Sequence, residues 1–122
     1  MIINLNRDVK LDADVMTKKD FDTLLSHGAE EAEDLLDSFK EFNGNPKLDY
    51  FSFDEDSQGD LLVKIDQTKF DNKAQIIDLV AACLSDFAWS EYSAYTMAED
   101  LPITEDDYCE KAKAEFYRAL TR

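Results

Sequence analysis

Outside its carboxylates, the chain holds few side chains that could carry out chemistry. His27 is the only histidine, so a zinc or di-iron site built from several histidines is excluded. A cysteine nucleophile would have to pair Cys83 or Cys109 with His27, but both cysteines fall on apolar faces of expected helices, where a buried thiol is usual. The three glycines form no phosphate-binding loop. We therefore expect no enzymatic activity, no metal and no cofactor.

Carboxylates dominate the charged residues. The chain has 28 Asp and Glu against 13 Lys and Arg, a net charge of −15, and the acids gather in residues 29–43, 49–60 and 99–110. Like charges at helical spacing cost a few tenths of a kcal/mol per pair, and a chain selected for stability alone would intersperse lysines. This clustering predicts that the negative electrostatic field of these segments has a function. The alternative is that these carboxylates form solvated surfaces that have no function.

We expect these acidic segments to build a partner-binding surface. On a helix, Glu30, Glu33 or Asp34, Asp37 and Glu41 fall on one side and recur about every 5–6 Å along the axis. Trp89 joins the candidates because aromatic residues are enriched among interface hot spots, with a half-buried core tryptophan as the alternative. The full candidate set is Glu30, Glu33, Asp34, Asp37, Glu41, Asp54, Glu55, Asp56, Asp60, Trp89, Asp106 and Asp107.

The segment from Asp54 to Asp60 is similar to the first half of a calcium-binding EF-hand loop. Asp54, Asp56, Gln58 and Asp60 would stand at ligand positions one, three, five and seven, and Gly59 would stand at position six, where the loop turns sharply. Position twelve, which needs a bidentate glutamate, is Ile65, and the flanking segments have the pattern of strands. An acidic hairpin tip is therefore the expected structure of this segment.

The elements that position these residues begin with a short strand over residues 2–5, followed by a loop over residues 7–16. Thr17 with Asp20 has the spacing of a capping box. Helical spacing then continues to Asn43-Gly44, as one long helix or as two that break near Ser26-His27-Gly28. Residues 48–53 and 61–65 are the expected strands of a hairpin.

Two more helices complete the expected fold. Asp71 or Asn72 caps a helix over residues 74–98 that is apolar around most of its circumference, as in a central helix. Leu101-Pro102 ends that helix, and Thr104 with Asp107 begins the last one. The predicted fold class is α+β in a single domain over residues 1–122. A small antiparallel sheet, made of the N-terminal strand and the hairpin, packs against three or four helices in the order β-α-β-β-α-α.

The charge and the cysteines also limit the partner and the compartment. A strongly negative surface repels nucleic acid and anionic membranes, so we expect neither to be bound directly and favour a basic protein partner. The start of the chain has no signal-peptide pattern, and neither cysteine stands in a C-x-x-C pair. These features fit a reducing cytoplasm. A monomer and a homodimer fit the sequence equally well.

In size, charge and charge distribution, the chain resembles the acidic DNA-mimic inhibitors. These include phage anti-restriction and anti-CRISPR proteins and the immunity proteins that neutralise nuclease toxins. The resemblance implies an inhibitor or decoy that occupies the basic nucleic-acid-binding surface of a nuclease or related enzyme. No motif carries the resemblance, so no residue role is transferred. An immunity protein or secretion-type chaperone for one cognate toxin or effector is the alternative, and a small metal-binding or enzymatic domain is the second alternative.

Overall fold

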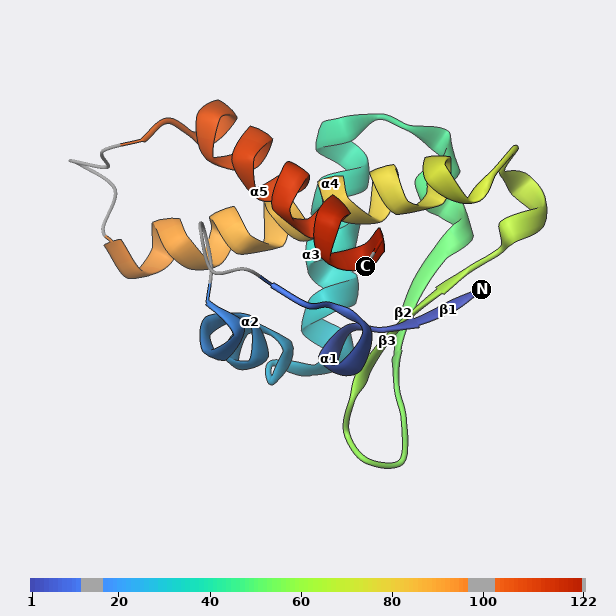
Figure 1. Cartoon of the computed structure of the whole chain (residues 1–122), viewed down its shortest axis with the longest axis horizontal. Helices are drawn as coiled ribbons and strands as arrows, with labels where there is room; N and C mark the ends of the chain where they lie inside the picture. The colour runs from blue at the N-terminus through green and yellow to red at the C-terminus, as the bar shows by residue number, and fades with distance from the viewer. Residues whose placement is uncertain (12–16, 97–102, 122) are drawn as a thin grey trace.

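The computed structural model describes residues 1–11, 17–96 and 103–121 and shows an α+β fold (Figure 1). Two 3-10 turns, η1 (Pro46–Tyr50) and η2 (Gln67–Lys69), flank the hairpin. The strands and helices are β1 (Ile2–Asn4), α1 (Leu5–Asp8), α2 (Lys18–Leu25), α3 (Gly28–Asn43), β2 (Phe51–Glu55), β3 (Leu61–Ile65), α4 (Lys73–Thr96) and α5 (Glu105–Thr121). The predicted small antiparallel sheet, packed against helices in the order β-α-β-β-α-α, is confirmed.

The three strands form one antiparallel sheet in the order β1-β3-β2. Ile3 of β1 and Phe53 of β2 both lie opposite Val63 of β3, and all three side chains are buried. Their neighbours on the other face, such as Ser52 and Asp54, are exposed. This alternation is the period of a strand that covers a core on one side and meets solvent on the other.

Helix α4 is the central helix, as its apolar circumference predicts. Figure 1 shows it running across the molecule alongside α5, and its Phe87 ring lies 5.6 Å from the Phe53 ring of the sheet. Asn72 Oδ1 accepts a hydrogen bond from Gln75 N (3.0 Å), and Gln75 Oε1 accepts one from Asp71 N (3.1 Å), so reciprocal bonds begin the helix. The predicted helix end at residues 97–98 and the stop at Leu101-Pro102 lie outside the described residues.

The other predicted helix ends are confirmed by hydrogen bonds. Thr17 Oγ1 accepts from Asp20 N (3.1 Å) at the start of α2, and Thr104 Oγ1 accepts from Asp107 N (3.2 Å) at the start of α5. Gly44 ends α3 with a left-handed φ of 73°. These caps satisfy backbone groups that a helix end leaves without partners.

The N-terminal strand is shorter than predicted, because a one-turn helix, α1, follows it directly. Asn4 Oδ1 accepts hydrogen bonds from Asn6 N (3.0 Å) and Arg7 N (3.1 Å), which turns the chain into helix after three strand residues. Leu5, expected in the strand, is fully buried in α1. Of the loop expected over residues 7–16, residues 12–16 lie outside the described part of the chain.

The first hairpin strand begins later than predicted, at Phe51 rather than at residue 48. Asn45 Oδ1 accepts from Lys47 N (3.0 Å), and Pro46 opens the 3-10 turn η1, which occupies the first part of the expected strand. Proline suits the first position of a helical turn because it has no N–H group to satisfy there. The aromatic residues thus suggested a strand at positions where the proline and its cap formed a turn.

Gly28 separates α2 from α3, so the segment forms two helices rather than one long helix. Its φ of +91° is left-handed, and a Cβ there would lie 2.8 Å from Glu55 Oε1. That oxygen accepts a hydrogen bond from Ala29 N (2.8 Å), so a carboxylate from β2 caps the start of α3. The residue that precedes α3, His27, makes no side-chain cap bond. The left-handed backbone therefore favours glycine at position 28, and a Cβ there would displace the end of the Glu55 side chain.

We expect Gly28→Ala to destabilise the protein by about 3 kcal/mol. The left-handed backbone costs about 1–2 kcal/mol for alanine, and displacement of the Glu55 carboxylate removes a charge-assisted hydrogen bond of about 1.5 kcal/mol. Gly44→Ala is the matched control, because Gly44 has φ +73° but no atom near its Cβ position. Its expected loss is about 1 kcal/mol. Equal losses in urea denaturation of the two variants would contradict the role of Glu55.

Candidate functional site

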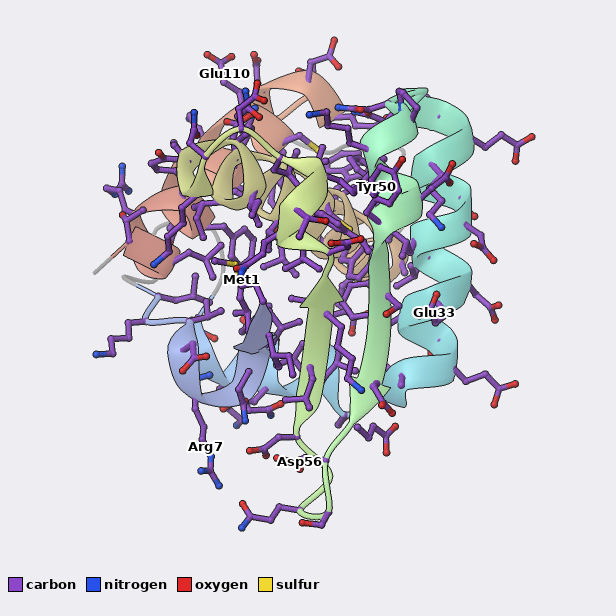
Figure 2. The ribbon with its side chains drawn as sticks, turned by 90° about the vertical axis from the view of Figure 1, so that its right-hand side faces the viewer. Met1, Arg7, Glu33, Tyr50, Asp56 and Glu110 are labelled. Atoms are coloured by element: carbon purple, nitrogen blue, oxygen red, sulfur yellow. The ribbon has the colours of Figure 1, made fainter. Side chains whose placement is uncertain are left out.

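Four carboxylates form a line along the solvent side of α3, and we call Glu30, Asp34, Asp37 and Glu41 the ridge. All four are exposed, and within residues 1–11, 17–96 and 103–121 none of their side chains forms an ion pair or a hydrogen bond. Figure 2 shows acidic side chains reaching outward from α3, away from the sheet. At about 1.5 Å per residue, neighbouring ridge residues are about 4.5–6 Å apart along the axis, and the ridge is about 16 Å long.

Glu33, expected on the same surface, points to the flank of α3 that faces the sheet. Its Oε1 accepts a hydrogen bond from Phe53 N of β2, and the residue is half-buried. Because β2 is an edge strand, this N–H would otherwise have no strand partner. Glu33 therefore fastens α3 to the sheet, and its neighbour Asp34 belongs to the ridge. From the spacing in the sequence, either Glu33 or Asp34 could have belonged to the acidic side of the helix.

The carboxylates of the hairpin are engaged within the molecule. Lys64 Nζ lies 2.8 Å from Asp54 Oδ2, and this hydrogen bond lowers the pKa of Asp54. Arg7 Nε lies 3.0 Å from Asp60 Oδ2, which also accepts from Asn4 Nδ2 (3.1 Å). The hairpin contains no base between residues 49 and 60, but β3 and α1 supply them in space. This segment therefore adds less free negative charge than its composition suggests.

The hairpin tip is built around Asp56. Asp56 Oδ1 accepts from both Gln58 N and Asp60 N (2.9 Å each), and Gly59 N donates to Asp56 O (3.1 Å). Figure 2 shows Asp56 at the opposite end of the molecule from Glu110, so the structure does not bring the hairpin and α5 clusters together. No group of three or more His, Cys, Asp or Glu suited to hold a metal ion occurs among the described residues.

A groove of about 500 Å³ lies where the last turn of α3 meets the middle of α4 and the start of α5. Phe39, Ala82 and Cys109 contribute apolar surface to it, and Phe42 stands at its side with 83% of its surface exposed. Its acidic lining residues are Asp86, Glu105, Asp106 and Glu110. The groove thus combines apolar surface with an acidic rim, and it starts at the end of α3 where the ridge finishes.

Asp86 is the unusual member of the groove. It is half-buried, and its carboxylate has no hydrogen-bond or ion-pair partner among the described residues. Burial raises the pKa of Asp86, and the nearby negative charge of Glu105 raises it further. The lysine in the groove, Lys113, pairs instead with Asp78 (3.2 Å). Asp86 therefore sits in the folded protein as a partly desolvated negative charge.

Sequence reasoning found only part of this groove. Asp106 was a candidate and lines it, while Asp107, also a candidate, is exposed on α5 outside the groove lining given by the described residues. Asp86 was missed because it counted as a polar interruption of an apolar helix. Phe42 was missed although it follows the last apolar residue of the α3 stripe, Phe39, by three positions and turns out to be exposed. A large apolar residue at the end of the apolar stripe of an amphipathic helix is the sequence feature that could have identified Phe42.

Trp89 belongs to an aromatic cluster between α4 and α5. Its ring centroid lies 5.8 Å from that of Tyr92 and 5.4 Å from that of Tyr108, and the two tyrosine rings stack at 4.8 Å. Trp89 is half-buried, whereas Tyr108 is buried, which raises the pKa of Tyr108 to about 12. These contacts give Trp89 a packing role between the two helices. Its predicted place in a partner-binding surface stays a prediction.

The histidine and the cysteines have different neighbours. His27 Nδ1 lies 3.4 Å from Glu31 Oε2, and His27 Nε2 lies 3.8 Å from Glu91 Oε1. Burial raises the pKa of the Cys83 thiol, and it raises the pKa of the half-buried Cys109 thiol to about 11. Both thiols are therefore protonated at neutral pH, which is unfavourable for a nucleophile. The expectation of a protein without enzymatic activity stays a prediction.

No protein-family model, no curated protein and no solved structure matches this chain. No residue role is therefore carried over from another protein. Within the described residues, no helix combines the length and the apolar character needed to cross a bilayer.

Neutralising the ridge should stabilise the protein by about 1 kcal/mol. The variant Glu30→Gln, Asp34→Asn, Asp37→Asn and Glu41→Gln removes three like-charged pairs at helical spacing, each worth about 0.2–0.5 kcal/mol. Urea denaturation at low salt measures the gain, which should shrink in 1 M NaCl, where the Debye length is about 3 Å. Glu33→Ala should act in the opposite direction and cost about 1–3 kcal/mol, because Phe53 N loses its acceptor. A loss of stability in the ridge variant would show that the ridge carboxylates have stabilising partners.

Asp86 should make stability fall as the pH rises. Its folded pKa is raised above the ordinary value of 3.8, so the folded state holds this proton more tightly than the unfolded state. That contribution is fully present below pH 3.8 and is lost as the pH rises through the folded pKa. Asp86→Asn should therefore stabilise the protein more at pH 7 than at about pH 3.5 in thermal denaturation. A Tm difference from wild type that is the same at both pH values would contradict this assignment.

Proposed function

We propose that this protein is an acidic inhibitor that binds the basic nucleic-acid-binding surface of a nuclease or related enzyme. The observation that supports it is the ridge, with four exposed carboxylates that have no ion-pair partner among the described residues. Their axial repeat of about 4.5–6 Å is of the same order as the rise of about 3.4 Å per phosphate along the axis of one B-DNA strand. Arginine and lysine side chains that bind phosphates pair equally well with carboxylates.

The charge of the whole chain supports the same mechanism. A net charge of −15 attracts a basic surface over a distance and speeds association, and it repels nucleic acid and anionic membranes. The ridge residues repel one another, so a chain under selection for stability alone would lose them. Their arrangement in a regular row on a helix fastened to the sheet fits a surface that binds cations in a defined geometry.

We further propose that the protein acts in the reducing cytoplasm. Cys83 and Cys109 are both free thiols, one buried in α4 and the other half-buried in α5. A small protein in an oxidising compartment would more commonly use its cysteines for disulfides.

A second candidate function is an immunity protein or chaperone that holds one cognate basic toxin or effector. The observation in its favour is Phe42, which is 83% exposed beside an acidic groove. Selective recognition of one partner draws on apolar contacts as well as on charge. A toxin or effector gene next to the gene for this protein would favour this candidate, whereas a phage operon would favour the inhibitor.

The inhibitor is tested by cleavage assays with purified restriction endonucleases and RNA-guided nucleases across a salt series. Inhibition should weaken as salt rises, because exposed charges separated by more than a Debye length are screened. The ridge variant should inhibit about 30-fold less well at low salt, from about 0.5 kcal/mol for each of four lost pairs.

The matched control changes four carboxylates elsewhere, through Asp20→Asn, Asp22→Asn, Asp66→Asn and Asp71→Asn. It has the same net charge as the ridge variant and keeps side-chain oxygens as acceptors, so it separates the ridge from charge in general. Inhibition that does not respond to salt, or that falls equally in both variants, would argue against binding through the ridge. No inhibition of any of these enzymes by the wild-type protein would remove the nuclease as the partner class.

A further inference from the structure

We infer that the groove between α3, α4 and α5 anchors one segment of the partner protein, in which an arginine stands next to apolar side chains. The inference rests on the proposed function in one respect, because it takes the partner to be basic. It adds a second binding element to the ridge, with its own chemistry. The ridge offers charge alone, whereas the groove offers apolar surface and charge together.

The apolar part of the argument starts from Phe42. It is the most exposed of the exposed large apolar residues in the described chain, ahead of Ile2 at 61% and Tyr50 at 40%. Phe42 lines the groove together with Phe39 and Cys109, which supply further apolar surface. An exposed phenylalanine gains free energy when an apolar side chain covers it, and aromatic residues next to a depression are typical anchor points of interfaces.

The charged part of the argument selects the occupant. Asp86, Glu105, Asp106 and Glu110 line the groove, and its one lysine, Lys113, is paired with Asp78. Asp86 is half-buried and has no partner among the described residues, so a cation placed beside it would relieve a partly desolvated charge. A purely apolar or an acidic segment would bury these carboxylates further without neutralising them, which is unfavourable.

Arginine suits this site better than lysine. Its planar guanidinium donates parallel hydrogen bonds to a carboxylate and also stacks on an aromatic ring, whereas lysine carries a compact and strongly hydrated charge. Asp86 and Phe42 line the same groove, so one side chain can approach both. The apolar neighbours of the arginine then cover the rest of the Phe42 ring.

The test uses three capped eight-residue peptides and the full-length protein in 150 mM NaCl. One peptide alternates arginine with leucine, the second alternates arginine with serine, and the third alternates glutamate with leucine. Nitrogen-15 NMR spectra identify the amide signals that each peptide shifts. The arginine–leucine peptide should shift Phe42, Ala82 and Cys109 in a saturable way and bind at least 10-fold more tightly than either of the other two.

Three variants assign the binding to the groove. Phe42→Ala should weaken the arginine–leucine peptide at least 10-fold and leave the fold intact, because Phe42 is exposed. Ile2→Ala is its matched control and should change the affinity less than 2-fold. Asp86→Asn should weaken binding about 5-fold while it raises the Tm, a combination that a merely structural role for Asp86 would not produce.

The outcomes separate the groove from the ridge. If the arginine–leucine peptide shifts only α3 signals between Glu30 and Glu41, or if Phe42→Ala binds it like wild type, the groove is not an anchor site, and the ridge keeps its proposed role. If the peptide occupies the groove in the ridge variant as well as in wild type, the anchor stands even where the nuclease assays fail. Equal binding of all three peptides, or no binding of the first, overturns the inference.

Discussion

Two carboxylate hydrogen bonds that run in opposite directions hold α3 in its observed orientation against β2. Glu33 of the helix accepts from the Phe53 N–H of the strand, and Glu55 of the strand accepts from the Ala29 N–H of the helix. Each bond satisfies a backbone donor that its own element leaves without a partner, one at a sheet edge and one at a helix start. Together they fix how α3 is turned, and this orientation decides which of its acids meet solvent.

The acidic residues therefore fall into two groups with different physical roles. Glu33, Glu55, Asp56 and Asp60 accept hydrogen bonds from backbone or cationic groups, so their negative charge is compensated locally. The ridge has no such compensation among the described residues, and Asp86 combines the lack of a partner with partial burial. Uncompensated charge lowers stability in the free protein, and this loss is recovered when a cationic partner approaches. Only the second group has negative charge that no contact within the described residues compensates.

Local patterns predicted the fold well because they act over a few residues. Thr17 and Thr104 show their role through the residue three positions later, and Leu61 to Ile65 alternates as a half-buried strand does. The candidate site was predicted less well because its members differ in contacts that cross the chain. Nothing near Glu33 in the sequence reveals that Phe53 lies within reach, and nothing near Asp60 reveals Arg7. The sequence gives the number of carboxylates, but only the structure shows which of them already form hydrogen bonds or ion pairs within the molecule.

The edges of the sheet have a consequence for how this molecule meets other chains. The outer edge of β2 is occupied by α3 through Glu33, and the other edge strand, β1, contributes only three residues. An extended peptide that joins a sheet needs a row of free backbone groups, and the same row promotes edge-to-edge aggregation. Strand addition is thus blocked at β2 and limited to three residues at β1, which disfavours edge-to-edge pairing of sheets and leaves the helices as the main surfaces that another chain can contact.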